Sequence, residues 1–98
     1  MTVKILIKRK VKDAAMAEVS KMLVQARTNA LGKNGYISSE TLSNCDNPNE
    51  ILVVSMWRSK ADWDVYREDQ TRMNFERECE QLFDGPTEYS VYNLGISQ

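Results

Sequence analysis

Apolar and polar residues alternate along VKILIKRKV, residues 3–11 of the chain. Val3, Ile5, Ile7 and Val11 fall on one side, with Arg9 as the exception among them. Lysines and Leu6 fall on the other side. A period of two over this length predicts a strand with one buried face.

The next apolar residues recur at steps of three and four, which predicts an amphipathic helix of about four to five turns. Asp13 is the expected N-cap, and Gly32 is well placed to end the helix. The apolar stripe consists of Ala15, Val19, Met22, Leu23, Ala26 and Ala30.

Two further strands are predicted over residues 36–45 and 51–57. Between them lies DNPNE, residues 46–50, where Pro48 and Asn49 favour a turn. The two strands and the short turn are typical of a β-hairpin.

A second helical region follows, in which Ser59 is the expected N-cap and Asp62 the residue that closes a weak capping box. Ala61, Val65 and Tyr66 are expected to face inward. The polar run EDQT, residues 68–71, predicts a kink or break before a segment that carries Phe75, Cys79, Leu82 and Phe83 at helical spacing. Asp84-Gly85-Pro86 ends this segment, and alternation over 87–94 predicts a last strand.

The order strand, helix, strand, strand, helix, strand is typical of an α+β, ferredoxin-like fold. We therefore expect a four-stranded antiparallel sheet with the helices on one face. With 98 residues and no internal repeat or linker, the chain is expected to form one domain over residues 1–98.

The strand at 51–57 is apolar on both sides, but helices can cover only one face of the sheet. Leu52, Val54 and Met56 would lie on the uncovered face, joined by Tyr92 and Leu94. A patch of this kind favours a homodimer in which two sheets pack face to face. The alternative is a monomer with some exposed apolar residues, and the lysines of the first strand count in its favour.

Composition excludes several classes of protein. The 13 Lys and Arg nearly balance the 14 Asp and Glu, so nothing favours nucleic acid or an anionic membrane as a partner. The basic run KRKVK, residues 8–12, lacks the exposed aromatics that RNA-binding modules of this fold use. It is interpreted as the solvated end of a strand.

No segment has the length and apolarity of a signal peptide or membrane span, which predicts a cytoplasmic location.

The chain contains no histidine and two cysteines, Cys45 and Cys79. This set has no metal-ligand spacing, and a nucleophilic cysteine would have no histidine as its base. Two reduced thiols and no metal site are the expectation.

The stretch GYISSETLSNCDNPNEILVVSMWRSKADWDVY, which starts at Gly35, resembles the antibiotic biosynthesis monooxygenase family. The shared features are a Gly-aromatic start to the second strand, an Asp-Asn-Pro turn, an apolar strand that ends on Trp57, and a Ser-capped helix. A Gly-Pro before the last strand also fits. The resemblance implies a dimeric α+β barrel with a pocket between sheet and helices in each subunit, lined by Trp57.

The same resemblance implies oxidation of a flat, electron-rich aromatic such as an anthrone or quinol, without metal, flavin or other cofactor. Two features depart from relatives of known activity. Haem-degrading members use a histidine and a first-strand asparagine that are lacking here. Members that oxidise aromatics carry an asparagine four residues before the tryptophan, where this chain has Val53. A non-catalytic dimeric module that binds a small molecule or partner is therefore the alternative function.

Trp57 is the best candidate for a functional residue, although a large aromatic at a strand end is more often part of a core. Trp63 falls between helix faces, so it could cover the pocket or lie half-exposed. Arg77 could stabilise an enolate or phenolate, but a surface pair with neighbouring glutamates is more common. Tyr36, Tyr66, Tyr89 and Tyr92 are possible hydroxyl donors. The expected pocket residues are Trp57, Trp63, Tyr66, Met22, Phe75 and Arg77.

Overall fold

The computed structural model describes residues 1–96 and has the expected ferredoxin-like α+β architecture. Four strands form one sheet in the order β2-β3-β1-β4, and all neighbouring strands run antiparallel. The elements are β1 (Val3–Lys10), η1 (Asp13–Ala15), α1 (Met16–Ala30), β2 (Tyr36–Ser43), β3 (Glu50–Trp57), α2 (Lys60–Arg67), α3 (Gln70–Cys79), η2 (Glu80–Leu82) and β4 (Glu88–Asn93).

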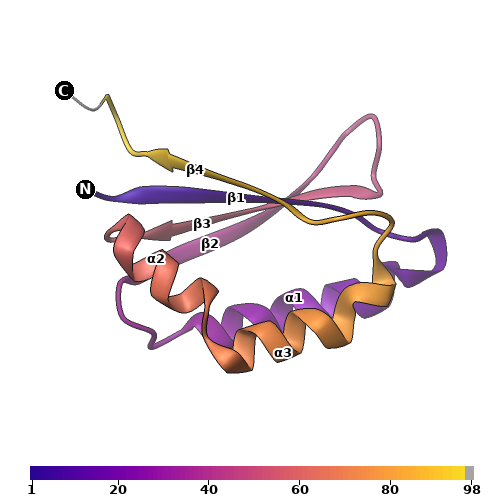
Figure 1. Cartoon of the computed structure of the whole chain (residues 1–98). Helices are drawn as coiled ribbons and strands as arrows, with labels where there is room; N and C mark the ends of the chain where they lie inside the picture. The colour runs from indigo at the N-terminus through magenta and orange to yellow at the C-terminus, as the bar shows by residue number, and fades with distance from the viewer. Residues whose placement is uncertain (97–98) are drawn as a thin grey trace.

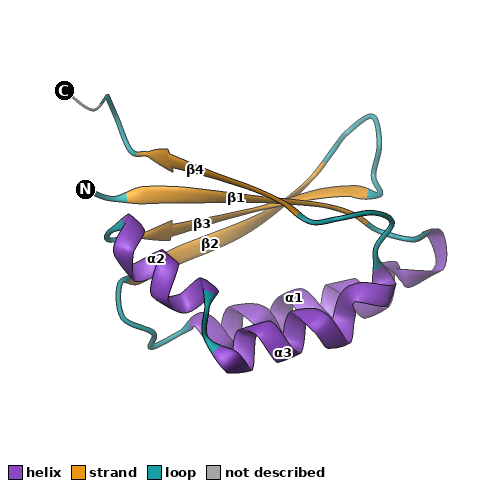
Figure 2. Cartoon of the chain, viewed as in Figure 1, coloured by secondary structure: helices purple, strands orange, loops and turns teal. Residues whose placement is uncertain are grey.

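All three α-helices cover the same face of the sheet (Figure 1). Figure 2 shows α1 and α3 side by side beneath the sheet, with α2 under the edge where β3 ends. The side chains that alternate toward the helices form two core clusters. One joins α1 to β3 and to the segments that follow β1 and η2, through residues such as Val19, Ile51, Val11 and Phe83. The other joins β1, β3 and α2 through Ile5, Trp57 and Trp63.

Local sequence signals account for the turns and helix starts. In the hairpin, Asn44 Oδ1 accepts hydrogen bonds from the backbone N–H groups of Asp46 and Asn47, at 2.8 and 3.1 Å. The predicted cap of α2 is confirmed, since Ser59 Oγ accepts from the Asp62 N–H at 3.1 Å. The predicted break is confirmed as well, because α2 ends at Arg67 and Asp69 caps α3.

Two helix predictions are wrong. Asp13 lies in a 3-10 turn that precedes α1, and α1 begins without a side-chain cap. The Asp13 carboxylate instead accepts a hydrogen bond from Asn49 Nδ2. In α2, Ala61 and Val65 are exposed, whereas Trp63 is buried and Tyr66 is half-buried.

The face of the sheet opposite the helices carries Leu52, Val54 and Met56, each half-buried in the single chain. Tyr92 and Leu94 are more than half exposed. We call these five residues the far face. Cross-strand pairing places Lys4 opposite Met56 and Lys8 opposite Leu52, and Lys8 pairs with Glu50 at 3.6 Å.

Candidate functional site

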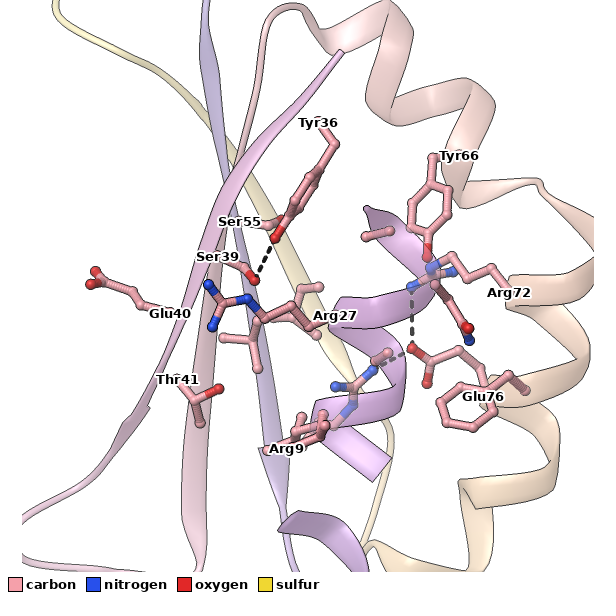
Figure 3. Close-up of a pocket in the computed structure, with 18 of the residues that line it drawn as sticks. Arg9, Arg27, Tyr36, Ser39, Glu40, Thr41, Ser55, Tyr66, Arg72 and Glu76 are labelled. Carbon is pink, nitrogen blue, oxygen red and sulfur yellow. Dashed lines mark hydrogen bonds and ion pairs between the residues drawn. The ribbon is translucent and has the colours of Figure 1, made fainter. Parts of the chain in front are cut away.

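A cavity of about 290 Å³ lies between the inner face of the sheet and the helices. Its walls come from β1, β2 and β3 on one side and from all three α-helices on the other (Figure 3). This volume is at the lower end of the range for small-molecule sites, roughly 300–1,000 Å³. The cavity is therefore suited to a small ligand.

Trp57 is the centre of an aromatic wall at one end of the cavity. Tyr66 stacks on it with ring centroids 5.0 Å apart and planes inclined by 29°. Tyr36 meets it edge-on at 5.3 Å, and Trp63 packs against it at 5.9 Å. Such pairs hold each ring in a fixed orientation, so the wall is a rigid aromatic surface whose rings are inclined to one another.

Polar atoms within this wall are mostly engaged. The buried Ser55 hydroxyl accepts a hydrogen bond from Trp57 Nε1 at 3.2 Å, which occupies the indole donor. Tyr36 Oη lies 2.8 Å from Ser39 Oγ. Among the residues described, the buried Trp63 Nε1 has no hydrogen-bond partner.

Two arginines and a glutamate meet at the other end of the cavity. The Glu76 carboxylate pairs with Arg9 and, at 3.4 Å, with Arg72. Figure 3 shows the two guanidinium groups on either side of that carboxylate. Arg72 also donates to Tyr89 Oη at 2.8 Å. We call Arg9, Arg72 and Glu76 the arginine cluster.

The alternation of β1 brings Arg9 into the interior. Val3, Ile5 and Ile7 face the helices, and Arg9 is the next residue on that side. Its side chain is only 3% exposed, and its guanidinium lies over the ring of Phe83 at 5.4 Å. Because a buried charge is costly without a partner, the pair with Glu76 on α3 makes this position tolerable and ties the helix to the sheet.

Arg72 links the cluster to the aromatic wall. Its guanidinium carbon lies 5.2 Å from the Trp63 ring centroid and 6.0 Å from that of Tyr66. Burial raises the pKa of the Tyr66 phenol, and the nearby Arg72 charge opposes that shift only in part. Tyr66 therefore stays protonated at neutral pH and can donate a hydrogen bond.

Neither cysteine lines the cavity. Cys45 is exposed near the hairpin, and Cys79 is half-buried at the end of α3. Burial, with Glu76 and Glu78 nearby, raises the pKa of the Cys79 thiol. Within residues 1–96, no group of three or more His, Cys, Asp or Glu is placed to hold a metal ion.

Four of the expected pocket residues, Trp57, Trp63, Tyr66 and Phe75, line the cavity. Met22 is buried in the core cluster that α1 forms with Val11, Ile51 and Phe83. Arg77 is exposed on α3, where it donates to Asn74 Oδ1. Their roles in function stay predictions.

Sequence reasoning missed all three members of the arginine cluster. Arg9 had one visible signal, since it interrupts the apolar side of its strand. Arg72 and Glu76 lie in a polar segment in which nothing distinguishes them from surface residues.

Comparison with known proteins gives consistent results. The family described as antibiotic biosynthesis monooxygenase matches residues 2–77. No protein of curated function matches the chain.

Solved structures with low sequence identity share the fold. SnoaB, a cofactor-independent oxygenase from Streptomyces nogalater, is 12% identical, with a TM-score of 0.84 over 98% of this chain and 95% of that one. A conserved protein from Methanosarcina mazei is 16% identical, with a TM-score of 0.86 over 94% and 91% of the two chains. A protein from Mycobacterium tuberculosis is 16% identical, with a TM-score of 0.84 over 99% and 98%.

Proposed function

Because this chain belongs to the antibiotic biosynthesis monooxygenase family, we propose that it is a cofactor-independent monooxygenase of a flat, electron-rich aromatic, of the anthrone or quinol type. The observation that carries the proposal is the rigid wall of Trp57, Tyr66, Trp63 and Tyr36 in a small cavity. A flat aromatic ring can stack on such a wall.

The proposed chemistry needs little from the protein beyond position and charge. For an anthrone, the ring CH₂ loses a proton, and the resulting carbanion transfers an electron to O₂. The two radicals combine to a peroxide anion, which takes the proton back to give a hydroperoxide, and this loses water to leave a carbonyl. Overall, CH₂ and O₂ give C=O and H₂O. The cavity would orient the substrate and exclude water.

Two cavity groups would stabilise the negative charge that develops on the substrate oxygen. Arg72 lies beside the aromatic wall, and Tyr66 is a protonated donor. Preorganised donors of this kind are a large contribution to catalysis of enolate-forming reactions.

Because the chain has no histidine, the proton would go to a tyrosine, a carboxylate or water. Glu76 and Glu40 both line the cavity, but Figure 3 shows Glu40 pointing away from the other labelled side chains. We therefore place Glu76, directly or through a water molecule, as the acceptor.

Oxygen uptake without added cofactor tests this function. With a panel of anthrones and quinols, the wild-type protein is expected to consume O₂. Trp57→Phe is expected to lose most of the turnover, because the wider indole surface that orients the substrate is replaced. Lys21→Met, which changes an exposed lysine of α1 that does not line the cavity, is the control and is expected to keep wild-type rates.

The alternative function is a non-catalytic module that binds a small molecule. It is favoured by Val53, an apolar side chain on the cavity wall. The resemblance implies an asparagine at this position in members that oxidise aromatics. Ligand binding without O₂ uptake across the whole panel would overturn the monooxygenase and favour this alternative.

We also propose that two chains pair through the far face. Leu52, Val54 and Met56 alternate with the buried Ile51, Ser55 and Trp57 along β3, so they lie on the face away from the helices. A patch of half-exposed apolar side chains on a sheet favours an interface. An isologous two-fold arrangement would bury these residues against their copies.

Val54→Lys is expected to convert the dimer to a monomer, because it places two like charges near the two-fold axis. Light scattering on the eluting species measures the change. Val65→Lys is the matched control, since Val65 is exposed on α2 at the other side of the sheet. A wild-type monomer at micromolar concentration would contradict the interface.

Within residues 1–96, no helix is long and apolar enough to cross a membrane. The cytoplasmic location and the single-domain organisation stay predictions.

A further inference from the structure

The inner end of the cavity carries more positive than negative charge. The arginine cluster contains two guanidinium groups and a single carboxylate, so one positive charge is not balanced within it. The exposed Arg27 and Glu40 also line the cavity, and their opposite charges sum to zero. The five charged residues of the lining therefore leave a net charge of one positive unit.

Arg9 has unused hydrogen-bonding capacity in this cluster. The residue is 4% exposed and lines the cavity, and among the described residues its Nε has no hydrogen-bond partner. A guanidinium has five N–H donors, and a buried donor without an acceptor is costly. An anionic group in the cavity would supply both the missing acceptor and the missing negative charge.

We propose that the substrate of this cavity is an aromatic carboxylate. Its ring packs against the aromatic wall, and its carboxylate binds at the arginine cluster. The proposal deepens the proposed function, because it rests on the cavity being the site of a flat aromatic. Guanidinium groups bind carboxylates through paired, charge-assisted hydrogen bonds, which makes this end of the cavity the determinant of substrate class.

The charge balance favours a monoanion over a phosphate. A carboxylate carries one negative charge, which matches the unbalanced unit of the arginine cluster. A phosphate monoester carries close to two negative charges at neutral pH, so it would leave excess negative charge beside Glu76 in a partly desolvated site. We therefore expect an aryl phosphate to bind more weakly than the matching carboxylate.

Three probes with one ring system test the proposal: 2-naphthoate, the neutral 2-naphthamide and 2-naphthyl phosphate. Their binding is measured by isothermal titration calorimetry under nitrogen, so that oxygenation plays no part in the readout. We expect 2-naphthoate to bind about 10- to 100-fold more tightly than the amide. Equal affinity for acid and amide, or tighter binding of the phosphate, would overturn the proposal.

Two variants change the charge of the cluster in opposite directions. Arg72→Met removes the unbalanced positive charge and is expected to abolish the preference for 2-naphthoate. Glu76→Gln keeps an acceptor oxygen beside Arg9 but adds a positive unit, and it is expected to tighten 2-naphthoate binding. Neither change should alter amide affinity by more than about threefold, because neither residue contributes a ring to the aromatic wall.

Lys21→Met is the control for the overall charge of the protein. It removes one positive charge at an exposed position of α1 that does not line the cavity and should leave the preference intact. If Glu76→Gln does not fold, Arg72→Met alone decides the matter, and an unchanged preference in that variant would contradict the proposal. The titrations do not require turnover, so a protein that consumes no O₂ can still show the preference for 2-naphthoate. The function and the substrate class are therefore tested separately.

Discussion

Trp57→Ala is expected to lower the free energy of unfolding by about 3–5 kcal/mol, the usual cost of truncating a large buried aromatic. The indole is 1% exposed. It packs against Tyr36, Trp63 and Tyr66, and its N–H donates to Ser55. Small domains have a total stability of about 5–15 kcal/mol, so this one side chain accounts for a large share of it.

Urea unfolding followed by circular dichroism measures this loss. Val24→Ala is the matched control, because Val24 also lines the cavity but is 68% exposed. It should change stability by no more than about 0.5 kcal/mol. A loss of only about 1 kcal/mol for Trp57→Ala, an ordinary value for a point mutation, would contradict a structural role for this residue.

The predicted stability loss changes how the activity of Trp57 variants must be interpreted. Trp57→Phe keeps a ring against Tyr66 but removes the hydrogen bond to Ser55. Its turnover is therefore informative only where unfolding experiments show that the variant is folded. The sequence allowed two interpretations of Trp57, as a core residue or as a pocket wall. Both describe its position, since Trp57 belongs to a core cluster and lines the cavity.

The fold could be predicted because each local signal agrees with the global arrangement. Alternation in β1, the apolar run of β3, the Asn-Pro turn, the cap at Ser59 and the polar break before α3 act within a few residues of where they stand. In α2 the expected burial of Tyr66 is confirmed, but that of Ala61 and Val65 is wrong, because two aromatics at a spacing of three outweigh the smaller side chains. Trp63 and Tyr66 bury far more apolar surface than Ala61 and Val65 could.

The charged end of the site could not be predicted, because it depends on contacts between distant parts of the chain. Arg9 and Glu76 are 67 residues apart, and their pairing follows only once α3 lies beneath β1. Sequence periodicity marks Arg9 as an exception on a buried face, but it does not show which carboxylate forms an ion pair with it. The same limit explains why Arg77, rather than Arg72, was the arginine expected in the pocket.

A glycine next to the aromatic wall carries the second large expected effect. Gly35 has φ of +85°, a conformation that side chains other than glycine rarely adopt. A Cβ built on it would lie 2.3 Å from Asp62 Oδ2. That same Asp62 carboxylate accepts hydrogen bonds from Ser59 Oγ and Asn34 Nδ2, so the glycine lets the loop before β2 contact the N-terminus of α2.

Gly35→Ala is therefore expected to lower the free energy of unfolding by about 2–4 kcal/mol, from backbone strain of about 1–2 kcal/mol and loss of the α2 cap. Gly32→Ala is the matched control, because Gly32 has φ of +82° and open space within 4 Å. It should cost the backbone strain alone, about 1–2 kcal/mol. Because α2 carries Trp63 and Tyr66, Gly35→Ala should also weaken 2-naphthoate and 2-naphthamide binding alike. Equal stability losses in the two variants would show that the contact between Gly35 and Asp62 does not position this helix.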